Sequence, residues 1–138
     1  MNASGFIVTP IGFVRSALTE REAAPLQGDE GAPAAWLELD PSVAEGLVGI
    51  GEGDEVIVLT WLHQARRELL QVHPRGRLER PLSGVFTTRS PDRPNPIGLH
   101  RVVVLAVVGT RLHVQPLEAI DGTPILDLKP VLGEIDSR

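Results

Sequence analysis

The chain contains no cysteine, which excludes disulfides, thiolate nucleophiles and cysteine-based metal sites. It also lacks any run of about 18 apolar residues, and its first residues, MNASGFIVTP, do not show the basic-then-apolar order of a signal peptide. Lysine is nearly absent, because Lys129 is the single lysine among the 13 basic residues. We therefore expect a cytoplasmic protein without membrane contact.

Charge is distributed unevenly along the chain. The net charge of −5 argues against a general nucleic-acid coat and against DNA as a partner. Residues 1–60 carry 2 basic and 10 acidic groups, whereas residues 61–101 carry 8 basic and 3 acidic groups. A folded basic patch of this kind can attract an anionic ligand despite the negative total. The same arginines can equally point in different directions into solvent.

The pattern of apolar residues is mostly that of β-strands. A length of 138 residues, with 42% hydrophobic and 22% charged residues, is typical of one globular domain, 1–138. Residues 40–50 predict one or two short helical turns, with Asp40 as the cap and Pro41 in the first position. The expected fold is therefore mainly β: a single-domain barrel or sandwich of short, largely antiparallel strands with one or two short helices. The expected strands lie within 6–16, 35–40, 54–63, 68–73, 98–109, 111–120 and 124–132.

The segment GVFTTRSPDRPNPIGLH, residues 84–100, is unusually stiff and charged for a connection between strands. Proline fixes its own φ and favours extended geometry in the residue before it, and this segment contains Pro91, Pro94 and Pro96. The loop therefore holds polar side chains ready for a ligand at little further entropic cost. Arg89 and Arg93 offer forked donors for a carboxylate or phosphate, and Asn95 offers both a donor and an acceptor. The alternative is a stiffened crossover whose arginines pair with surface acids.

Other single residues carry weaker signals. His63 and Gln64 end a buried strand, where sites often begin, although a lone histidine there is more often structural. His100 and His113 lie in strand patterns without an acidic partner at metal-ligand spacing, so we expect no metal site. The chain has no glycine-rich turn between a strand and a helix and no Gly-x-Ser-x-Gly frame, so dinucleotide, P-loop and serine-nucleophile patterns are not supported.

Four stretches in order along the chain carry a family resemblance. They are IGFVRSAL (11–18), LTWLHQ (59–64), GVFTTRSPDRPNPIGLHRV (84–102) and LEAIDGTPILDLKPVL (117–132). Together they resemble the motifs of the TsaA/TrmO-like family. The resemblance implies a β-barrel methyltransferase that uses S-adenosyl-L-methionine and forms a homodimer, with the cofactor in a cleft near the subunit contact. It also implies a reaction, the N6-methylation of threonylcarbamoyladenosine next to the anticodon of tRNA.

The same resemblance assigns roles to individual residues. The cofactor site would contain Gln27, His63, Gln64, Arg89, Leu99, Leu117, Glu118, Ala119 and Ile120. Arg93 and Asn95 would lie on the substrate side, one facing a carboxylate or phosphate and the other a base edge. Asp121 and Asp92 are the candidates for a general base that takes the proton from N6.

Several positions depart from the family pattern. Asp92 stands where an aromatic residue is common, Leu26 where an arginine is common, and Val131 where a tyrosine is usual. The sequence ends at Arg138, before the C-terminal domain that longer members carry. Two alternatives to a tRNA methyltransferase therefore stay open: a methyltransferase of the same fold that acts on a small metabolite, and a non-catalytic regulatory domain that binds S-adenosylmethionine.

Overall fold

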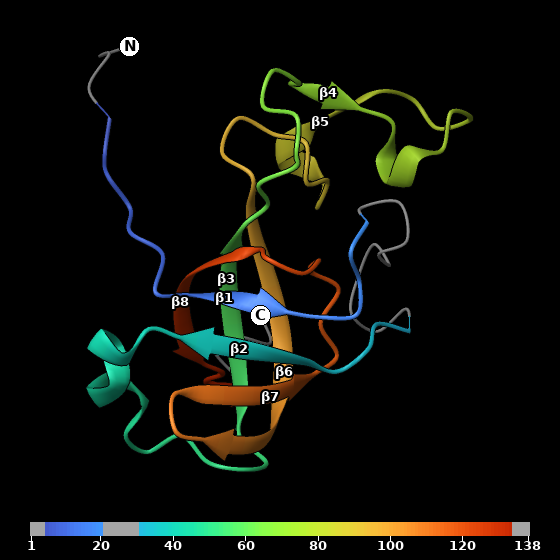
Figure 1. Cartoon of the computed structure of the whole chain (residues 1–138). Coiled ribbons are helices and arrows are strands. Elements are labelled where there is room, and N and C mark those ends of the chain that lie inside the picture. Colours follow the sequence, from blue (N-terminus) through green and yellow to red (C-terminus); the bar gives the residue numbers. More distant parts are fainter. Residues whose placement is uncertain (1–4, 21–30, 134–138) are drawn as a thin grey trace.

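Six antiparallel strands form a closed barrel in the computed structural model, which describes residues 5–20 and 31–133 (Figure 1). The barrel order is β1-β2-β7-β6-β3-β8, and it closes because β1 pairs with both β2 and β8. The mainly-β prediction is therefore confirmed. Of the two architectures that the sequence left open, barrel and sandwich, the structure has the barrel. The barrel strands are β1 (Gly12–Arg15), β2 (Ala35–Leu39), β3 (Glu55–Trp61), β6 (Ile97–Val108), β7 (Arg111–Gln115) and β8 (Pro124–Pro130).

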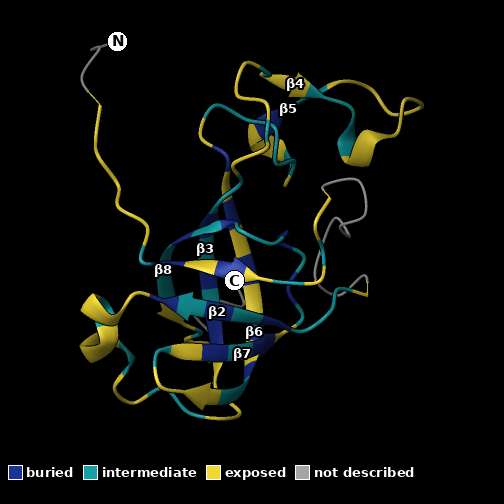
Figure 2. Ribbon diagram, in the orientation of Figure 1, coloured by how far each residue is buried: buried dark blue, intermediate teal, exposed yellow. Residues whose placement is uncertain are grey.

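The barrel interior is filled by every second residue of its strands. In β2, Leu37 and Leu39 point inward as their alternation predicts, and in β6 the inward row contains Val102 and Val104. Figure 2 shows these buried stretches along the strands of the barrel. The same inward row of β6 also contains His100, which is 4% exposed. A polar ring therefore replaces an apolar side chain at one level of the barrel.

Two predicted strands are much shorter than expected. Of 6–16, only Gly12–Arg15 is a strand, and residues 5–10 extend away from the barrel as an exposed arm (Figures 1 and 2). Gly12 sits so close to the Glu38 carbonyl that a side chain would not fit. Of 68–73, only β4 (Gln71–Val72) is a strand, and it pairs with β5 (Ser83–Gly84) outside the barrel.

The predicted helical turn is present as a 3₁₀ helix, η3 (Pro41–Leu47). Asp40 caps it by accepting a hydrogen bond from the Ser42 amide at 2.8 Å, and Pro41 occupies the first position. Two further 3₁₀ turns are η4 (Pro74–Gly76) and η5 (Val85–Thr87). Within the described ranges, no helix is long and apolar enough to span a membrane.

Residues 62–96 form a lobe on one end of the barrel, between the end of β3 and the start of β6 (Figure 1). The lobe contains β4, β5, η4 and η5. It includes most of the basic segment 61–101 and most of residues 84–100, the proline-rich loop. The stiff, charged segment is therefore part of this lobe and not a simple connection between neighbouring strands.

Candidate functional site

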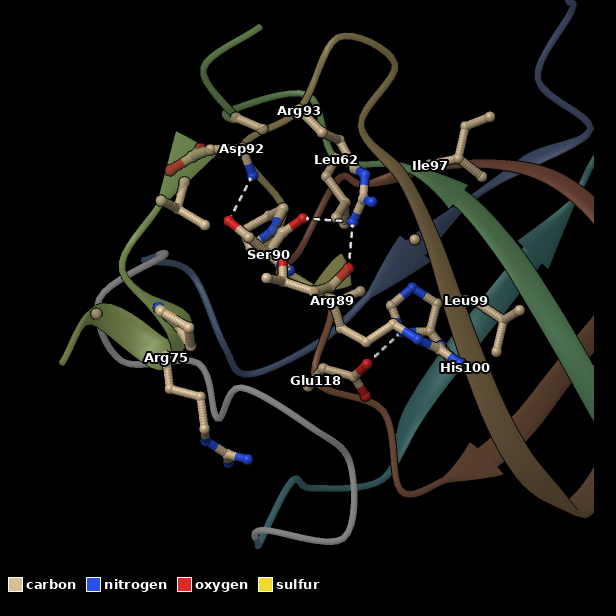
Figure 3. Close-up of a pocket in the computed structure, with 18 of the residues that line it drawn as sticks. Leu62, Arg75, Arg89, Ser90, Asp92, Arg93, Ile97, Leu99, His100 and Glu118 are labelled. Atoms are coloured by element: carbon tan, nitrogen blue, oxygen red, sulfur yellow. Dashed lines mark hydrogen bonds and ion pairs between the residues drawn. The ribbon is translucent and has the colours of Figure 1, made fainter. Parts of the chain in front are cut away.

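A cleft of about 1570 Å³ lies between the lobe and the adjoining part of the barrel (Figure 3). Its walls come from β3 and the residues that follow it, the part of the lobe that contains β4 and η4, the proline-rich loop, the first half of β6 and the segment that follows β7. These elements are distant in sequence, but β3 and β6 are paired and Thr60 stands opposite Gly98. The barrel register therefore brings three of the four motif regions to one cavity.

Most of the predicted site residues line this cleft. They are His63, Gln64, Arg89, Leu99, Glu118, Ala119 and Ile120 from the expected cofactor set, and Arg93 and Asn95 from the expected substrate side. Leu117 does not line it, because its side chain is fully buried in the barrel core. Asp121 is also absent from the lining. Gln27 lies outside the described residues.

Arg89 has an exposed guanidinium group in the cleft wall. It forms no hydrogen bond or ion pair with any residue that the structure describes. A free guanidinium presents forked donors that suit a carboxylate or a phosphate. Arg89 is therefore available to an anionic ligand.

Arg93 uses its guanidinium differently. Its Nη1 donates to the Thr88 and Ser90 carbonyls at 3.0 and 2.9 Å (Figure 3). Its Nη2 donates to the Val85 carbonyl at 2.8 Å. These three bonds tie η5 to the proline-rich loop. Arg93 therefore holds the loop in shape, a use that differs from both pairing with surface acids and binding a ligand.

Asn95 lies at the outer edge of the same loop. Its Oδ1 accepts a hydrogen bond from Arg67 Nη2 at 3.3 Å, while Arg67 Nε donates to the Pro94 carbonyl at 2.8 Å. The Arg67 guanidinium also lies 5.0 Å from the centre of the Trp61 ring. Asn95 is exposed, and its side-chain NH₂ group has no partner among the described residues.

Asp121 supports a neighbouring segment. Its Oδ1 accepts a hydrogen bond from the Ser16 amide at 3.0 Å, and its own amide donates to the Leu18 carbonyl at 2.6 Å. These contacts fasten residues 16–18 to the turn that precedes β8. In this geometry the carboxylate is not part of the cleft wall.

Thr60, His100 and Glu118 form an arrangement that no sequence pattern predicted. His100 Nε2 lies 2.7 Å from Thr60 Oγ1, and its Nδ1 lies 2.5 Å from Glu118 Oε1 (Figure 3). Thr60 is fully buried, and the Glu118 side chain is 16% exposed. The alternation of β6 already placed His100 beside Val102 on the inward face, where a polar ring needs partners. That was the available signal, because no local spacing links His100 to Glu118.

Comparisons with known proteins show which family this chain is similar to. Residues 13–137 match the model of the family described as tRNA-methyltransferase O N-terminal domain. A protein from Methanothermobacter thermautotrophicus, named a probable S-adenosyl-L-methionine-binding protein, is 41% identical over 94% of this chain and 93% of its own length. An S-adenosyl-L-methionine-binding protein from Archaeoglobus fulgidus is 43% identical over 94% of this chain and 92% of its own length.

Solved structures agree with this match. A crystal structure of TrmO from Pseudomonas aeruginosa has a TM-score of 0.78 and 31% identity, and the alignment covers 99% of this chain and 60% of that one. Another TrmO crystal structure has a TM-score of 0.78 and 33% identity, covering 98% of this chain and 61% of that one. The present chain therefore spans about three fifths of the TrmO chains that it resembles.

Proposed function

Because the chain belongs to the family of the tRNA-methyltransferase O N-terminal domain, we propose that it transfers a methyl group from S-adenosylmethionine to N6 of threonylcarbamoyladenosine in tRNA. The family membership confirms the resemblance seen in the sequence, and with it the cofactor, which is also the ligand in the names of both archaeal relatives. The tRNA acceptor, the homodimer and the cytoplasmic location are parts of the proposal.

The observation that carries the proposal is the composition of the cleft. Seven of the nine residues that the family resemblance assigns to the cofactor line it, and they come from three separate parts of the chain. Arg89 supplies a free guanidinium that suits the carboxylate of the methionyl group. Leu99, Ala119 and Ile120 supply apolar surface beside it, which suits an adenine ring. The donor set in the cleft therefore fits S-adenosylmethionine.

Bound in this cleft, the cofactor would supply an activated methyl group on a sulfonium. Methyl transfer depends more on alignment than on strong acid–base help. The protein contributes that alignment through a loop whose shape is held from within by Arg93 and by three prolines. Arg93 is in this proposal a positioning residue for the substrate side of the cleft, and the free amide of Asn95 is available to a base edge.

Two further features support a tRNA acceptor and a dimer. The basic segment 61–101 contains the whole lobe beside the cleft, where its arginines can attract phosphates. On the outer face of β6, Ile97 and Leu99 are each 49% exposed and Val103 is 36% exposed, and all three line the cleft. In this outward row the exposed Arg101 stands between Leu99 and Val103, and the apolar side chains around it suit a contact with a second copy near the cofactor.

Mass spectrometry of tRNA nucleosides tests the acceptor. Total tRNA is compared between a deletion strain and the same strain complemented with the gene. We expect the methylated threonylcarbamoyladenosine to disappear and then to return. An unchanged tRNA profile together with intact cofactor binding would reject tRNA and favour a small-molecule acceptor. No saturable binding of the cofactor would reject the methyltransferase itself.

A variant of Arg89 tests the cofactor site. Arg89→Ala removes a charge-assisted hydrogen bond worth about 1.5–3 kcal/mol, so we expect the Kd for S-adenosylmethionine to rise by about 10- to 100-fold in calorimetry. Arg77→Ala is the matched control, because Arg77 is an exposed arginine of the same lobe that does not line the cleft. Equal Kd values for the two variants would show that Arg89 does not bind the cofactor.

A further inference from the structure

We propose that Glu118, held in place by His100 and Thr60, is the general base that takes the proton from the acceptor nitrogen. This inference rests on the proposed methyl transfer and adds the proton acceptor that the reaction needs. It moves Glu118 from the cofactor set, where the family resemblance put it, to the acceptor side of the cleft. It starts from these three side chains, of which His100 and Glu118 line the cleft and Thr60 lies behind them in the barrel interior.

The hydrogen-bonding roles follow from the chemistry of the three groups. An ionised Glu118 carboxylate can only accept, so Nδ1–H of His100 donates to Oε1. In a neutral imidazole the other nitrogen, Nε2, then accepts from the Thr60 hydroxyl. The His100 ring is 4% exposed and fixed at both ends. It therefore sets the position of the Glu118 carboxylate with little freedom.

The second oxygen of Glu118 is left for a ligand. Oε2 has no hydrogen-bond partner among the described residues, and no side-chain oxygen among them is both buried and unpaired. Glu118 lines the cleft with a partly exposed side chain. One oxygen is thus fastened to the barrel interior, and the other is accessible from the cleft.

Among the residues that the structure describes, two other acidic side chains line the cleft, and both are engaged. Glu55 forms an ion pair with Arg101 at 2.6 Å. Asp92 accepts a hydrogen bond from the Arg66 amide at 2.9 Å and makes a further interaction. Neither of them has a carboxylate that is both positioned by buried groups and accessible. Glu118 is therefore the cleft acid best placed to receive a proton.

The chemistry of the acceptor gives this carboxylate a role. An acylated exocyclic nitrogen is a poor nucleophile, because its lone pair is delocalised into the carbonyl group, so it must lose its proton as it is methylated. In the step, the nitrogen–methyl bond forms while the methyl–sulfur bond breaks, and the electron pair of that bond stays on sulfur. The proton of the nitrogen passes to Oε2 of Glu118, so one positive and one negative charge are neutralised together.

Steady-state kinetics and calorimetry on Glu118→Gln test the inference. General-base catalysis contributes about 10²–10⁴-fold, so we expect kcat to fall by at least about 100-fold while the Kd for S-adenosylmethionine stays within about twofold. Added formate should restore part of the rate in Glu118→Ala, because it can replace the missing carboxylate. Glu45→Gln is the control for loss of an acid, since Glu45 is exposed on η3 and does not line the cleft.

A pair of variants tests the positioning role of His100. His100→Asn can keep a donor near the Nδ1 position, whereas His100→Leu removes it, so we expect kcat to be higher in the asparagine variant at similar KM. Equal rates in the two variants would contradict the positioning role. If Glu118→Gln weakens cofactor binding and leaves kcat unchanged, Glu118 is a cofactor ligand and the inference is overturned. If the wild-type protein binds the cofactor but methylates no tRNA, the proposed function fails first.

Discussion

Arg89 and Arg93 lie four residues apart in one loop, yet their guanidinium groups are used in different ways. Arg93 donates three hydrogen bonds to backbone carbonyls of its own loop and of η5. Arg89 has no partner among the described residues. The first arginine makes the loop rigid enough for the second to remain free and still be well placed. The ordered loop therefore lowers the entropic cost of binding at Arg89.

Position 98 requires glycine because of the atoms packed around it. A Cβ there would meet Thr60 Oγ1, would lie 2.7 Å from His100 Nε2 and would lie 3.1 Å from Leu62 Cδ2. Gly98→Ala must therefore push apart the buried pair Thr60–His100, and we expect a loss of about 1–3 kcal/mol in the free energy of unfolding, measured with urea. Gly51→Ala is the control, because no atom lies within 4 Å of its Cβ position. Equal stability of the two variants would contradict the crowding.

The residue-level site was only partly predictable from the sequence. The loop pattern pointed to Arg89 and the family resemblance to Leu99, and the structure places both in the wall of the cleft. The different use of Arg93 was not predictable, because its partners are backbone carbonyls and their positions depend on the folded turn. The contact of His100 with Glu118 was not predictable either, since it depends on how the chain returns after β7.

At the scale of elements, strand prediction was correct where one face of a strand lies in the core and the other faces outward. β2, β6 and β7 alternate between the core and the outside, so their period of two is visible in the sequence. The prediction was wrong for most of 6–16 and 68–73. Those segments are apolar, but Phe6 and Ile7 are almost fully exposed and Leu70 is 64% exposed. Apolar composition alone does not show what a segment packs against.

The capped turn η3 gives a prediction about pH. Hydrogen bonds from the Ser42 side chain and from the Ser42 amide hold the pKa of Asp40 below its usual value of 3.8. Because the folded pKa is the lower one, the cap stabilises the fold above the unfolded pKa and loses this effect as pH falls through the folded value. Asp40→Asn keeps an acceptor without the charge. We expect wild type to exceed this variant in urea midpoint near pH 6.

The gap between the two proteins should narrow as pH falls below about 3.8, because the wild-type carboxylate then becomes protonated while the asparagine does not titrate. Urea midpoints of both proteins, measured from pH 6 to pH 2.5, give this difference. The contributions of the other carboxyl groups cancel in the difference, because both proteins contain them. A gap that stays constant over this range would show that the charge of Asp40 contributes nothing to the capped turn.

At the scale of the whole molecule, charge is separated along the fold. The first 60 residues are strongly acidic and contribute β1, β2, η3 and most of β3. The basic segment 61–101 contains the whole lobe beside the cleft (Figure 1). A negative total charge therefore coexists with a local basic surface. Such an arrangement steers an anionic partner toward one end of the barrel and away from the rest.

The lobe should therefore carry most of the salt dependence of tRNA binding. Arg77 and Arg80 are exposed lobe residues that do not line the cleft. Each phosphate contact that is lost lowers the slope of log affinity against log salt by about 1, so we expect a shift of about 2 in the double variant Arg77→Gln/Arg80→Gln. Filter binding across a salt series measures it. The control Arg15→Gln/Lys129→Gln removes equal charge from β1 and β8.

The two double variants distinguish tRNA binding to the surface of the lobe from a general effect of the protein's net charge. An equal loss of slope in both would mean that tRNA responds only to the net charge of the molecule, and the lobe would have no special role. No change in either would mean that phosphates are not contacted at all, which would favour a small acceptor that enters the cleft alone. A loss confined to the lobe variant, with the cofactor Kd unchanged, would place the tRNA backbone beside Arg89 and the proline-rich loop.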